Sequence, residues 1–449
     1  MATADFHEVA DVRLNGQTVV YEHGWQSWSP TGAYPATATS PRAPSSRSHT
    51  GHFRPGKAAP EHGFQGEGLL AVAGDDGDVV RIWSAPDPSR EVPSIRARTE
   101  DGRLVVSADG EVAEQSYPGG LWPALGAWAD DVAGRAGLGP VPSLPTVWCS
   151  WYQYFLGVTE EDVMENLAAI DELDLDVGVI QIDDGYETEI GDWLERSPRF
   201  PSPLAELADR IRAGGRRAGI WTAPLLVGER SRLAAHHPDW LVRGAGAGRN
   251  WGQDLAALDV THPDAAAHLQ HVFQTFSAWG FDYFKVDFMY AGAVEGVRWA
   301  DATGIAAYRE ALRLIRQAIG PSATLLGCGA PILPSVGLVD AMRVSPDTGP
   351  QYEPNGDDLS QPSQLAAVLT GRARAFQHAR LWVNDPDCLI ARPVMERREE
   401  WARHVERFGG LRCSSDRLAS LDQWGLETTR RLLRPSSTEP FDLSQLDAA

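Results

Sequence analysis

The chain has 449 residues, of which 61 are Asp or Glu and 40 are Lys or Arg, and its formal net charge is −21. An excess of acidic residues this large argues against nucleic acid or an anionic membrane as a partner, because phosphate binding requires clustered Lys and Arg. The sequence contains no apolar run long enough to cross a membrane. The length allows about two to three domains, although a single barrel can use roughly 250 residues or more.

The N-terminus has no basic stretch followed by an apolar segment, so no secretory signal is expected and a cytoplasmic location is the default. The four cysteines (Cys149, Cys328, Cys388 and Cys413) lie far apart in the sequence and form no CxxC pair. This spacing predicts neither a disulfide framework nor a zinc site. The chain also has 16 tryptophans, a residue that packs in cores and against the apolar face of sugar rings.

Residues 1–115 are predicted to form a small all-β, sandwich-like domain. Short apolar or alternating runs bounded by Gly, Asp and Asn indicate strands at Val12–Tyr21, Gly68–Ala73, Val79–Ser84 and Leu104–Ser107. Pro35–Ala59 is rich in Pro, Ser, Thr and Arg and predicts a long polar loop, whose role the sequence leaves open. Trp25 and Trp28 precede this loop. We interpret them as residues that pack the domain against its neighbour, with a place in a binding site as the alternative.

Helical spacing at Leu121–Ala136, followed by the Gly- and Pro-rich stretch Gly137–Pro145, predicts a helical linker over residues 116–145. From residue 146 to 434, short apolar strands alternate with amphipathic helical patterns, which is typical of a parallel α/β fold. The eight predicted strands are Thr146–Tyr152, Val177–Ile182, Ala218–Thr222, Tyr283–Phe288, Ala323–Gly327, Ala341–Val344, Leu381–Val383 and Gly410–Cys413. Eight such units predict a (β/α)8 TIM barrel, followed by a polar tail at 435–449.

Helical patterns fill most of the gaps between these strands. They lie at Glu160–Leu173, Pro203–Gly214, Pro263–Trp279, Ile305–Ile319, Ser363–His378 and Met395–Phe408, with a closing helix at Leu421–Leu433. The gap between the fifth and sixth strands is too short for a full helix, so that unit is expected to be reduced.

Polar residues follow the predicted strands at their carboxyl ends, where enzymes of this fold place their active sites. In Phe281–Tyr290, Lys285 and Asp287 lie on one face at the end of the fourth strand, because alternate residues of a strand point the same way. A buried ammonium and carboxylate are costly unless they pair or act in catalysis. A structural ion pair is therefore the alternative to a catalytic role. The other strand ends contribute Trp151, Asp183, Asp184, Trp221, Cys328, Gly329, Arg343, Asp347 and Asn384–Asp387.

The predicted barrel mouth is rich in carboxylates and aromatic rings and nearly free of His. A transition-metal site is disfavoured, since metal hydrolases of this fold usually use several His ligands, whereas a Mg²⁺ or Ca²⁺ site built from Asp alone stays open. Carboxylates accept hydrogen bonds from hydroxyl groups, and Trp covers the C–H face of a sugar ring. The mouth therefore suits a neutral, hydroxyl-rich ligand.

Two carboxylates on opposite walls of such a pocket are the groups that glycoside hydrolysis requires. Lys285 would keep Asp287 ionised, as a nucleophile must be. Asp347 would be the acid, provided that burial or a neighbouring carboxylate raises its pKa against the effect of Arg343.

Simpler structural roles compete with these interpretations. Asp183–Asp184 and Asn384–Asp387 each fit a turn or a helix cap after a strand, and Cys328 fits a small buried residue. The interpretation as a site is favoured because several of these groups follow successive strands of one barrel.

Together these motifs resemble glycoside hydrolase clan D, and most closely the family 36 α-galactosidases. The resemblance runs from about Trp148 to Asp416, and its most specific parts are the Lys-x-Asp of the fourth strand and the Arg-x-x-x-Asp of the sixth. It implies a retaining exo-α-galactosidase that needs no metal or other cofactor, with Asp287 as nucleophile and Asp347 as general acid/base. The resemblance further implies sugar contacts by Trp151, Asp183, Asp184, Lys285, Cys328, Gly329 and Arg343. Trp221, at the end of the third strand, is also a candidate substrate-binding residue.

The expected substrate is an oligosaccharide or another galactoside, with Asp183 and Asp184 selecting an axial O4. The segment Gly327–Pro331 departs from the family pattern near O2, so three related activities stay open: α-N-acetylgalactosaminidase, β-L-arabinopyranosidase and galactosyl transfer. Alternatives of other classes are a sugar-binding barrel without turnover and a divalent-metal lyase or aldolase. Members of the family often form oligomers, so a homo-oligomer also stays open.

Overall fold

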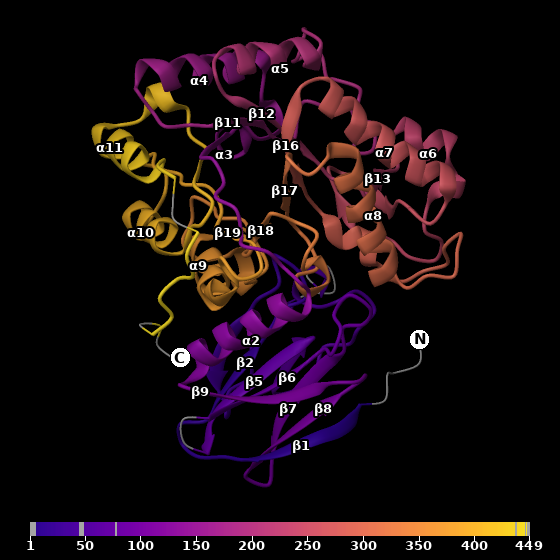
Figure 1. Cartoon of the computed structure of the whole chain (residues 1–449), viewed down its shortest axis with the longest axis vertical. Coiled ribbons are helices and arrows are strands. Elements are labelled where there is room, and N and C mark those ends of the chain that lie inside the picture. The colour runs from indigo at the N-terminus through magenta and orange to yellow at the C-terminus, as the bar shows by residue number, and fades with distance from the viewer. Residues whose placement is uncertain (1–5, 45–48, 77–78, 436–437, 445, 447–449) are drawn as a thin grey trace.

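The computed structural model describes residues 6–44, 49–76, 79–435, 438–444 and 446. They form an N-terminal β-sandwich and a barrel, with helix α2 (Leu121–Arg135) between the two (Figure 1). Residues 45–48 of the predicted polar loop lie outside the described residues, as do positions 436, 437, 445 and 447–449 of the predicted tail.

The N-terminal unit consists of two antiparallel sheets whose inner faces enclose an apolar core. One sheet has the order β1 (His7–Arg13), β8 (Arg103–Ala108), β7 (Ser94–Glu100) and β4 (Phe64–Glu67). The other has the order β3 (Gly32–Pro35), β2 (Val19–Glu22), β5 (Leu69–Asp76), β6 (Val79–Ser84) and β9 (Ala113–Pro118). Leu104 and Val106 of β8 are fully buried while Arg103 is exposed, which is the alternation expected of a strand with one face on a core.

The predicted strand Val12–Tyr21 is wrong as a single element, because a turn divides it. Asn15 Oδ1 accepts a hydrogen bond from Gln17 N at 2.8 Å, and Asn15 O accepts one from Thr18 N at 3.2 Å. An Asn side chain that bonds the backbone two residues on favours a turn over a continuous strand. The chain therefore leaves one sheet at the end of β1 and enters the other at β2.

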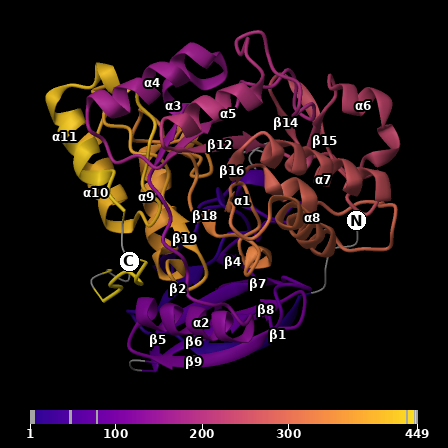
Figure 2. The same ribbon diagram turned by 45° about the horizontal axis from the view of Figure 1, so that its top comes forward.

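The barrel is an eight-stranded parallel sheet surrounded by helices, which confirms the predicted fold class (Figures 1 and 2). Its order is β19 (Val383–Asp385), β18 (Ala341–Arg343), β17 (Thr324–Gly327), β16 (Phe281–Val286), β12 (Arg217–Thr222), β11 (Val179–Ile182), β10 (Val147–Cys149) and β20 (Cys413–Ser414). The ends of the sheet meet where Gly410 N and Leu411 N donate to Asn384 O at 3.1 and 2.9 Å. All eight strand ends therefore face a common mouth.

The helices lie close to their predicted positions. The barrel helices are α4 (Glu160–Glu172), α5 (Leu204–Ala213), α7 (Pro263–Ala278), α8 (Gly304–Ile319), α9 (Gln364–Ala373), α10 (Arg398–Phe408) and α11 (Gln423–Leu432). Thr159 begins α4 with a capping box, in which its hydroxyl accepts from Asp162 N at 3.1 Å and the Asp162 carboxylate accepts from Thr159 N at 2.9 Å. As predicted, the gap between β17 and β18 holds only a short 3₁₀ turn, Leu333–Ser335.

The sequence did not predict an insertion between β12 and β16. It contains a three-stranded antiparallel sheet, β13 (Leu226–Gly228), β15 (Gln253–Ala257) and β14 (Arg249–Asn250), together with α6 (Arg232–His236). Two further short helices are α1 (His49–His52) in the loop between β3 and β4, and α3 (Trp151–Tyr154) directly after β10. Short strands and one-turn helices carry too few residues to produce a clear periodic pattern.

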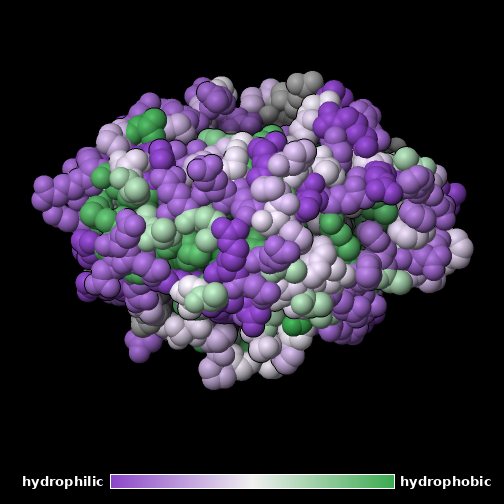
Figure 3. Space-filling model, turned by 90° about the horizontal axis from the view of Figure 1, so that it is seen from above, coloured by the Kyte–Doolittle hydropathy of each residue, from purple (hydrophilic) through white to green (hydrophobic). Residues whose placement is uncertain are grey.

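The outer surface of the barrel is predominantly polar. Seen from above, over α4 and α5, hydrophilic residues dominate, with apolar patches between them (Figure 3). Within the described part of the chain, no helix has both the length and the apolar character needed to cross a membrane.

A buried arginine joins the two units. Arg374 follows α9 and is fully buried, and burial lowers its pKa to about 9. Its guanidinium donates to five backbone carbonyl oxygens: Ser27 (2.7 Å), Gln26 (2.9 Å), Val344 (3.1 Å), Gly24 (3.2 Å) and Ser29 (3.2 Å). Four of these belong to the sandwich segment that carries Trp25 and Trp28. Arg374 therefore fixes that segment against the end of β18.

The two tryptophans of this segment pack at the domain interface, as the sequence analysis favoured. Trp25 is buried, and its carbonyl accepts from Ile332 N of the barrel at 2.9 Å. The ring of Trp28 meets Phe288 edge-on, at 4.9 Å between centroids. Because Phe288 follows Asp287, Trp28 also lies beside the candidate site.

We expect Arg374→Leu to lower the melting temperature by at least about 5 °C, because each buried carbonyl left without its donor costs about 1–3 kcal/mol. Differential scanning calorimetry measures the change. Arg403→Leu is the matched control, since Arg403 is exposed on α10 and makes only a 3.9 Å ion pair with Glu399. Equal, small shifts in both variants would show that Arg374 does not fix the interface.

Candidate active site

Asp287 follows β16 and is surrounded by hydrogen-bond donors. Trp221 Nε1 donates to its Oδ2 at 3.1 Å, and Phe288 N donates to its Oδ1 at 2.7 Å. Lys285 Nζ lies 3.7 Å from Oδ2. These groups stabilise the ionised carboxylate and fix its direction, as a carboxylate nucleophile requires.

The backbone directly after Asp287 is strained. Phe288 has φ 51° and ψ 30°, a left-handed conformation that is unfavourable for a bulky residue. Its ring is held by Trp28 at 4.9 Å and by Trp251 at 5.0 Å between centroids. Aromatic packing from both the sandwich and the inserted sheet thus maintains the conformation that turns Phe288 N toward Asp287.

Lys285 connects Asp287 to Asp183 at the end of β11. Its Nζ donates to Asp183 Oδ2 at 3.1 Å, and the same oxygen accepts from Gln181 Nε2 at 2.6 Å. Burial disfavours the charged ammonium, but the carboxylates of Asp183 and Asp287 outweigh burial and raise the pKa of Lys285. Lys285 therefore stays protonated and holds two carboxylates in place.

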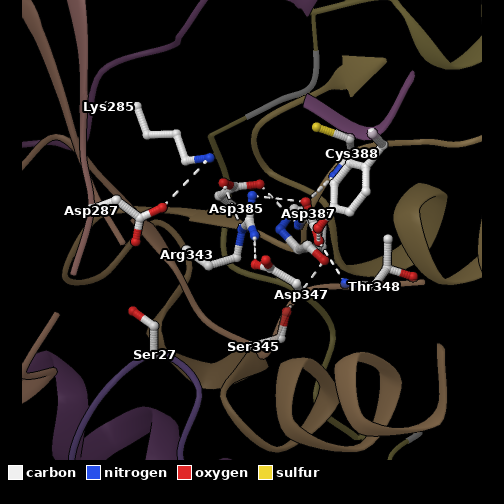
Figure 4. Close-up of polar contacts among 12 residues, drawn as sticks. Ser27, Lys285, Asp287, Arg343, Ser345, Asp347, Thr348, Asp385, Asp387 and Cys388 are labelled. Atoms are coloured by element: carbon white, nitrogen blue, oxygen red, sulfur yellow. Dashed lines mark hydrogen bonds and ion pairs between the residues drawn. The ribbon is translucent and has the colours of Figure 1, made fainter. Parts of the chain in front are cut away.

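Arg343, at the end of β18, binds three carboxylates (Figure 4). Its Nη1 lies 3.0 Å from Asp347 Oδ1, its Nε 3.0 Å from Asp385 Oδ2 and its Nη2 2.8 Å from Asp387 Oδ1. Asp387 also accepts from the Tyr152 hydroxyl. The Asn384–Asp387 segment, which the sequence left between a turn and a site, thus supplies two of the carboxylates that hold Arg343.

Asp347 lies among groups that favour its protonated form. Burial, together with the carboxylate of Asp387, raises the pKa of Asp347 to about 7, although Arg343 acts in the opposite direction. Its side chain keeps 30% of its accessible surface, so a ligand can reach it. The sequence analysis set burial or a neighbouring carboxylate as the condition for a proton donor, and the carboxylate of Asp387 provides such a neighbour at the half-buried Asp347.

Trp251 is a site residue that the sequence analysis missed. Its Nε1 donates to Asp184 Oδ2 at 2.8 Å. It occupies the two-residue turn between β14 and β15 with φ 50°, followed by Gly252 with φ 70°. A large residue with positive φ in such a turn is unusual, because Asn, Asp or Gly normally occupies that position. The Asn-Trp-Gly sequence at 250–252 was the available signal for this hairpin.

Asp184 offers an acceptor that the protein leaves unused. Its Oδ1 is buried and has no hydrogen-bond partner in the described structure. Burial, with the carboxylate of Glu187 beside it, raises the pKa of Asp184 to about 10. Glu187 is another residue that the sequence analysis missed. A ligand hydroxyl that bonds Oδ1 of Asp184 would give this oxygen a hydrogen-bond partner.

Aromatic rings lie next to the carboxylates, and a groove lies beside one of these rings. Trp221 is buried, and its ring meets Trp193 at 5.8 Å and Trp251 at 6.5 Å between centroids. A groove of about 720 Å³ lies beside Trp251, lined by residues of the 246–255 segment and by Thr50. The predicted polar loop Pro35–Ala59 therefore contributes to the rim of this groove through Thr50.

The remaining predicted site residues lie at the same end of the barrel. Gly329 has φ 51°, and a Cβ there would come within 2.8 Å of Trp28 Cη2, so the close approach requires glycine. Cys328 is fully buried after β17. Trp151 begins α3 directly after β10, and its ring packs against Phe155 at 5.1 Å between centroids.

The cysteine spacing, which indicates no cluster, is misleading in three dimensions. Cys149, Cys388 and Cys413 place their sulfur atoms within 4.8 Å of one another. The reason is topological, because β20 pairs with β10 on one side and meets Leu389 on the other, so distant parts of the sequence become neighbours.

Comparison with known proteins gives consistent matches. A model of the melibiase family matches residues 143–304. TtGalA, an α-galactosidase from Thermus thermophilus solved with stachyose, has a TM-score of 0.81 and 28% identity over 96% of this chain and 94% of its own. The bifunctional α-galactosidase/sucrose kinase AgaSK of Mediterraneibacter gnavus is 31% identical over 109 residues, which are 23% of this chain and 11% of that protein. The A type blood α-D-galactosamine galactosaminidase of Flavonifractor plautii is 31% identical over 140 residues, 28% of this chain and 13% of that protein. The match to either curated relative thus spans well under a fifth of that protein's length.

The raised pKa of Asp347 can be tested by measuring how the stability of the fold depends on pH. Its pKa of about 7 in the folded state lies above the unfolded value of about 3.9, so the folded state binds more protons and stability falls as pH rises through this window. Asp347→Asn cannot ionise. We therefore expect its melting temperature to fall less than that of the wild type between about pH 5 and about pH 8, measured by differential scanning fluorimetry.

The control for this experiment is Asp282→Asn. Asp282 lies near the opposite end of β16 and is half exposed in an ion pair with Arg217, so this variant should keep the wild-type pH dependence. Parallel curves for the wild type and Asp347→Asn would contradict a raised pKa at Asp347.

Proposed function

We propose that this chain, which the melibiase match and the similarity to the T. thermophilus enzyme assign to the α-galactosidase family, is a retaining, exo-acting α-galactosidase. The observation that carries the proposal is the contrast between two carboxylates of one barrel mouth. Asp287 is held by the donors Trp221 and Lys285, whereas the pKa of Asp347 is raised to about 7. One acid is thus suited to attack and the other to give a proton.

In the first step, Asp287 would attack C1 of the galactosyl residue while Asp347 donates its proton to the departing glycosidic oxygen. Lys285 and Trp221 orient the attacking carboxylate. The product is a β-linked galactosyl ester on Asp287 and a free alcohol. The proton on Asp347 is consumed in this step.

In the second step, the ionised Asp347 would remove a proton from a water molecule that attacks C1. The bond to Asp287 breaks and α-galactose leaves, so the configuration at C1 is retained after two inversions. Arg343 would support this exchange of roles because it also binds Asp385 and Asp387, so its charge stays paired when Asp347 is protonated.

The pocket supports a sugar with a hydroxyl group directed at Asp184. The indole of Trp251 bonds Asp184, whose buried Oδ1 has no partner in the described structure, and the neighbouring Asp183 bonds Lys285. A neutral ring with several hydroxyl groups satisfies these acceptors, while the tryptophan faces cover its C–H surface. The groove beside Trp251 leaves space for the rest of an oligosaccharide.

A second candidate is an α-N-acetylgalactosaminidase with the same two carboxylates. The partial match to the blood-group galactosaminidase favours this possibility, and Cys328 with Gly329 lies where the family resemblance places the sugar O2. A panel of p-nitrophenyl α-galactoside, α-N-acetylgalactosaminide and β-L-arabinopyranoside separates the candidates. The highest kcat/KM on the α-galactoside supports the first proposal, and the highest value on the galactosaminide favours the second.

We expect Asp287→Ala to lower kcat on p-nitrophenyl α-galactoside by at least about 1,000-fold, because the substitution removes the carboxylate that would form the galactosyl ester. Added azide should restore part of the turnover by attacking C1 in place of the missing side chain. Asp282→Asn, on the strand that leads to Asp287, is the matched control and should keep near wild-type activity. Near wild-type activity in Asp287→Ala would exclude this residue as the nucleophile.

We expect kcat/KM to fall as pH rises above about 7, by about tenfold per pH unit well beyond that value, because Asp347 must be protonated before it can donate. A pH–rate profile with an aryl galactoside measures this limb. Asp347→Ala should abolish the limb. If the fall in kcat/KM above about pH 7 persists unchanged in Asp347→Ala, the titrating group is not Asp347.

A further inference from the structure

Three buried cysteines lie behind the sugar pocket, at the point where the barrel closes. Cys149 ends β10, Cys388 lies shortly after β19, and Cys413 begins β20. All three are buried free thiols, and their sulfur atoms lie within 4.8 Å of one another. Cys388 Sγ and Cys413 Sγ are 3.1 Å apart. The proposed sugar chemistry uses none of the three.

The spacing of these sulfur atoms fits a single metal ion. A Zn–S bond of about 2.3 Å places the sulfurs of a trigonal or tetrahedral centre about 3.8–4.0 Å apart. Sulfurs that already lie within 4.8 Å of one another can reach this geometry by small side-chain movements. Three converging thiolates select soft ions over Mg²⁺ or Ca²⁺.

A fourth oxygen ligand is within reach. Cys149 Sγ donates to Asp183 Oδ2 at 3.3 Å, so the carboxylate of Asp183 borders the cluster. A carboxylate can complete a zinc centre that already has three sulfur ligands. The Gln181 amide, whose Nε2 lies 3.4 Å from the same sulfur, would orient this side of the site.

The surrounding charges favour a cation. The cationic groups next to the cluster and pocket are Lys285 and Arg343, and they are outnumbered by Asp183, Asp287, Asp385 and Asp387.

We propose that Cys149, Cys388 and Cys413 form a binding site for one thiophilic d10 metal ion of the Zn²⁺ and Cd²⁺ class, with Asp183 as the fourth ligand. Each thiol that is still protonated releases its proton to solvent as its metal–sulfur bond forms, and no electron is transferred. Because Asp183 also accepts from Lys285, occupancy of this site changes the hydrogen bonding of the sugar pocket.

The test is a Cd²⁺ titration of the full chain, which is first reduced, treated with a chelator and kept free of oxygen. Binding is measured by the thiolate-to-cadmium charge-transfer absorption. We expect the band to saturate at one Cd²⁺ per chain. Cys388→Ser and Cys413→Ser should each weaken binding by at least about 100-fold. Cys328→Ser is the matched control, because Cys328 is equally buried but lies outside the cluster, and it should keep the wild-type titration.

Circular dichroism verifies that each variant is folded before its titration. A folded wild type without the charge-transfer band would overturn the proposal, and so would unchanged binding in both Cys388→Ser and Cys413→Ser. A disulfide between Cys388 and Cys413 in the protein as isolated would also overturn it, because it removes two of the three ligands. The absorption readout does not depend on glycosidase activity. A failure of the metal-site proposal can therefore be distinguished from a failure of the proposed function.

Discussion

The arrangement of the barrel mouth depends on one buried guanidinium. Arg343 contacts Asp347, Asp385 and Asp387, which lie at the ends of two neighbouring strands. A buried carboxylate is costly unless it is paired, and the planar fork of arginine can bind several at once. Because one positive charge is divided among three acids, it does not keep Asp347 ionised against burial and the field of Asp387. The contact that holds the mouth together therefore also leaves one acid able to carry a proton near neutral pH.

Around Asp287 the balance of charges and donors is different. There Lys285 has two carboxylate neighbours, and Asp287 receives an additional indole donor from Trp221. The strained backbone of Phe288 points one more donor at Asp287, and it persists because rings from the sandwich and from the inserted sheet enclose it. Arg374 fixes the sandwich segment that supplies Trp28. The N-terminal unit is thus part of the support of the site.

Much of the fold could be predicted from the sequence because its signals are local. Amphipathic spacing located α4 and α8, and the strand ending in Lys285 and Asp287 stands out as an apolar run with charges on one face. Contacts between distant residues leave no such pattern. Trp251 bonds Asp184, which lies 67 residues earlier in the sequence, and this contact could not be predicted. The three cysteines meet only when the barrel closes, and the roles of Asp385 and Asp387 depend on where Arg343 points. The pKa of Asp347 could be stated only as a condition, because it is set by these same contacts.

The most direct test of this account is to find the residue that carries the sugar during turnover. The wild-type enzyme is incubated with 5-fluoro-α-galactosyl fluoride, which forms the glycosyl ester quickly and releases it slowly, and peptic peptides are then analysed by mass spectrometry. The account predicts one fluorogalactosyl group per chain, attached to Asp287. A label on any other residue would contradict the assignment of the nucleophile. Turnover of the fluoride with the β-anomer as the first product and no covalent label would contradict the retaining mechanism.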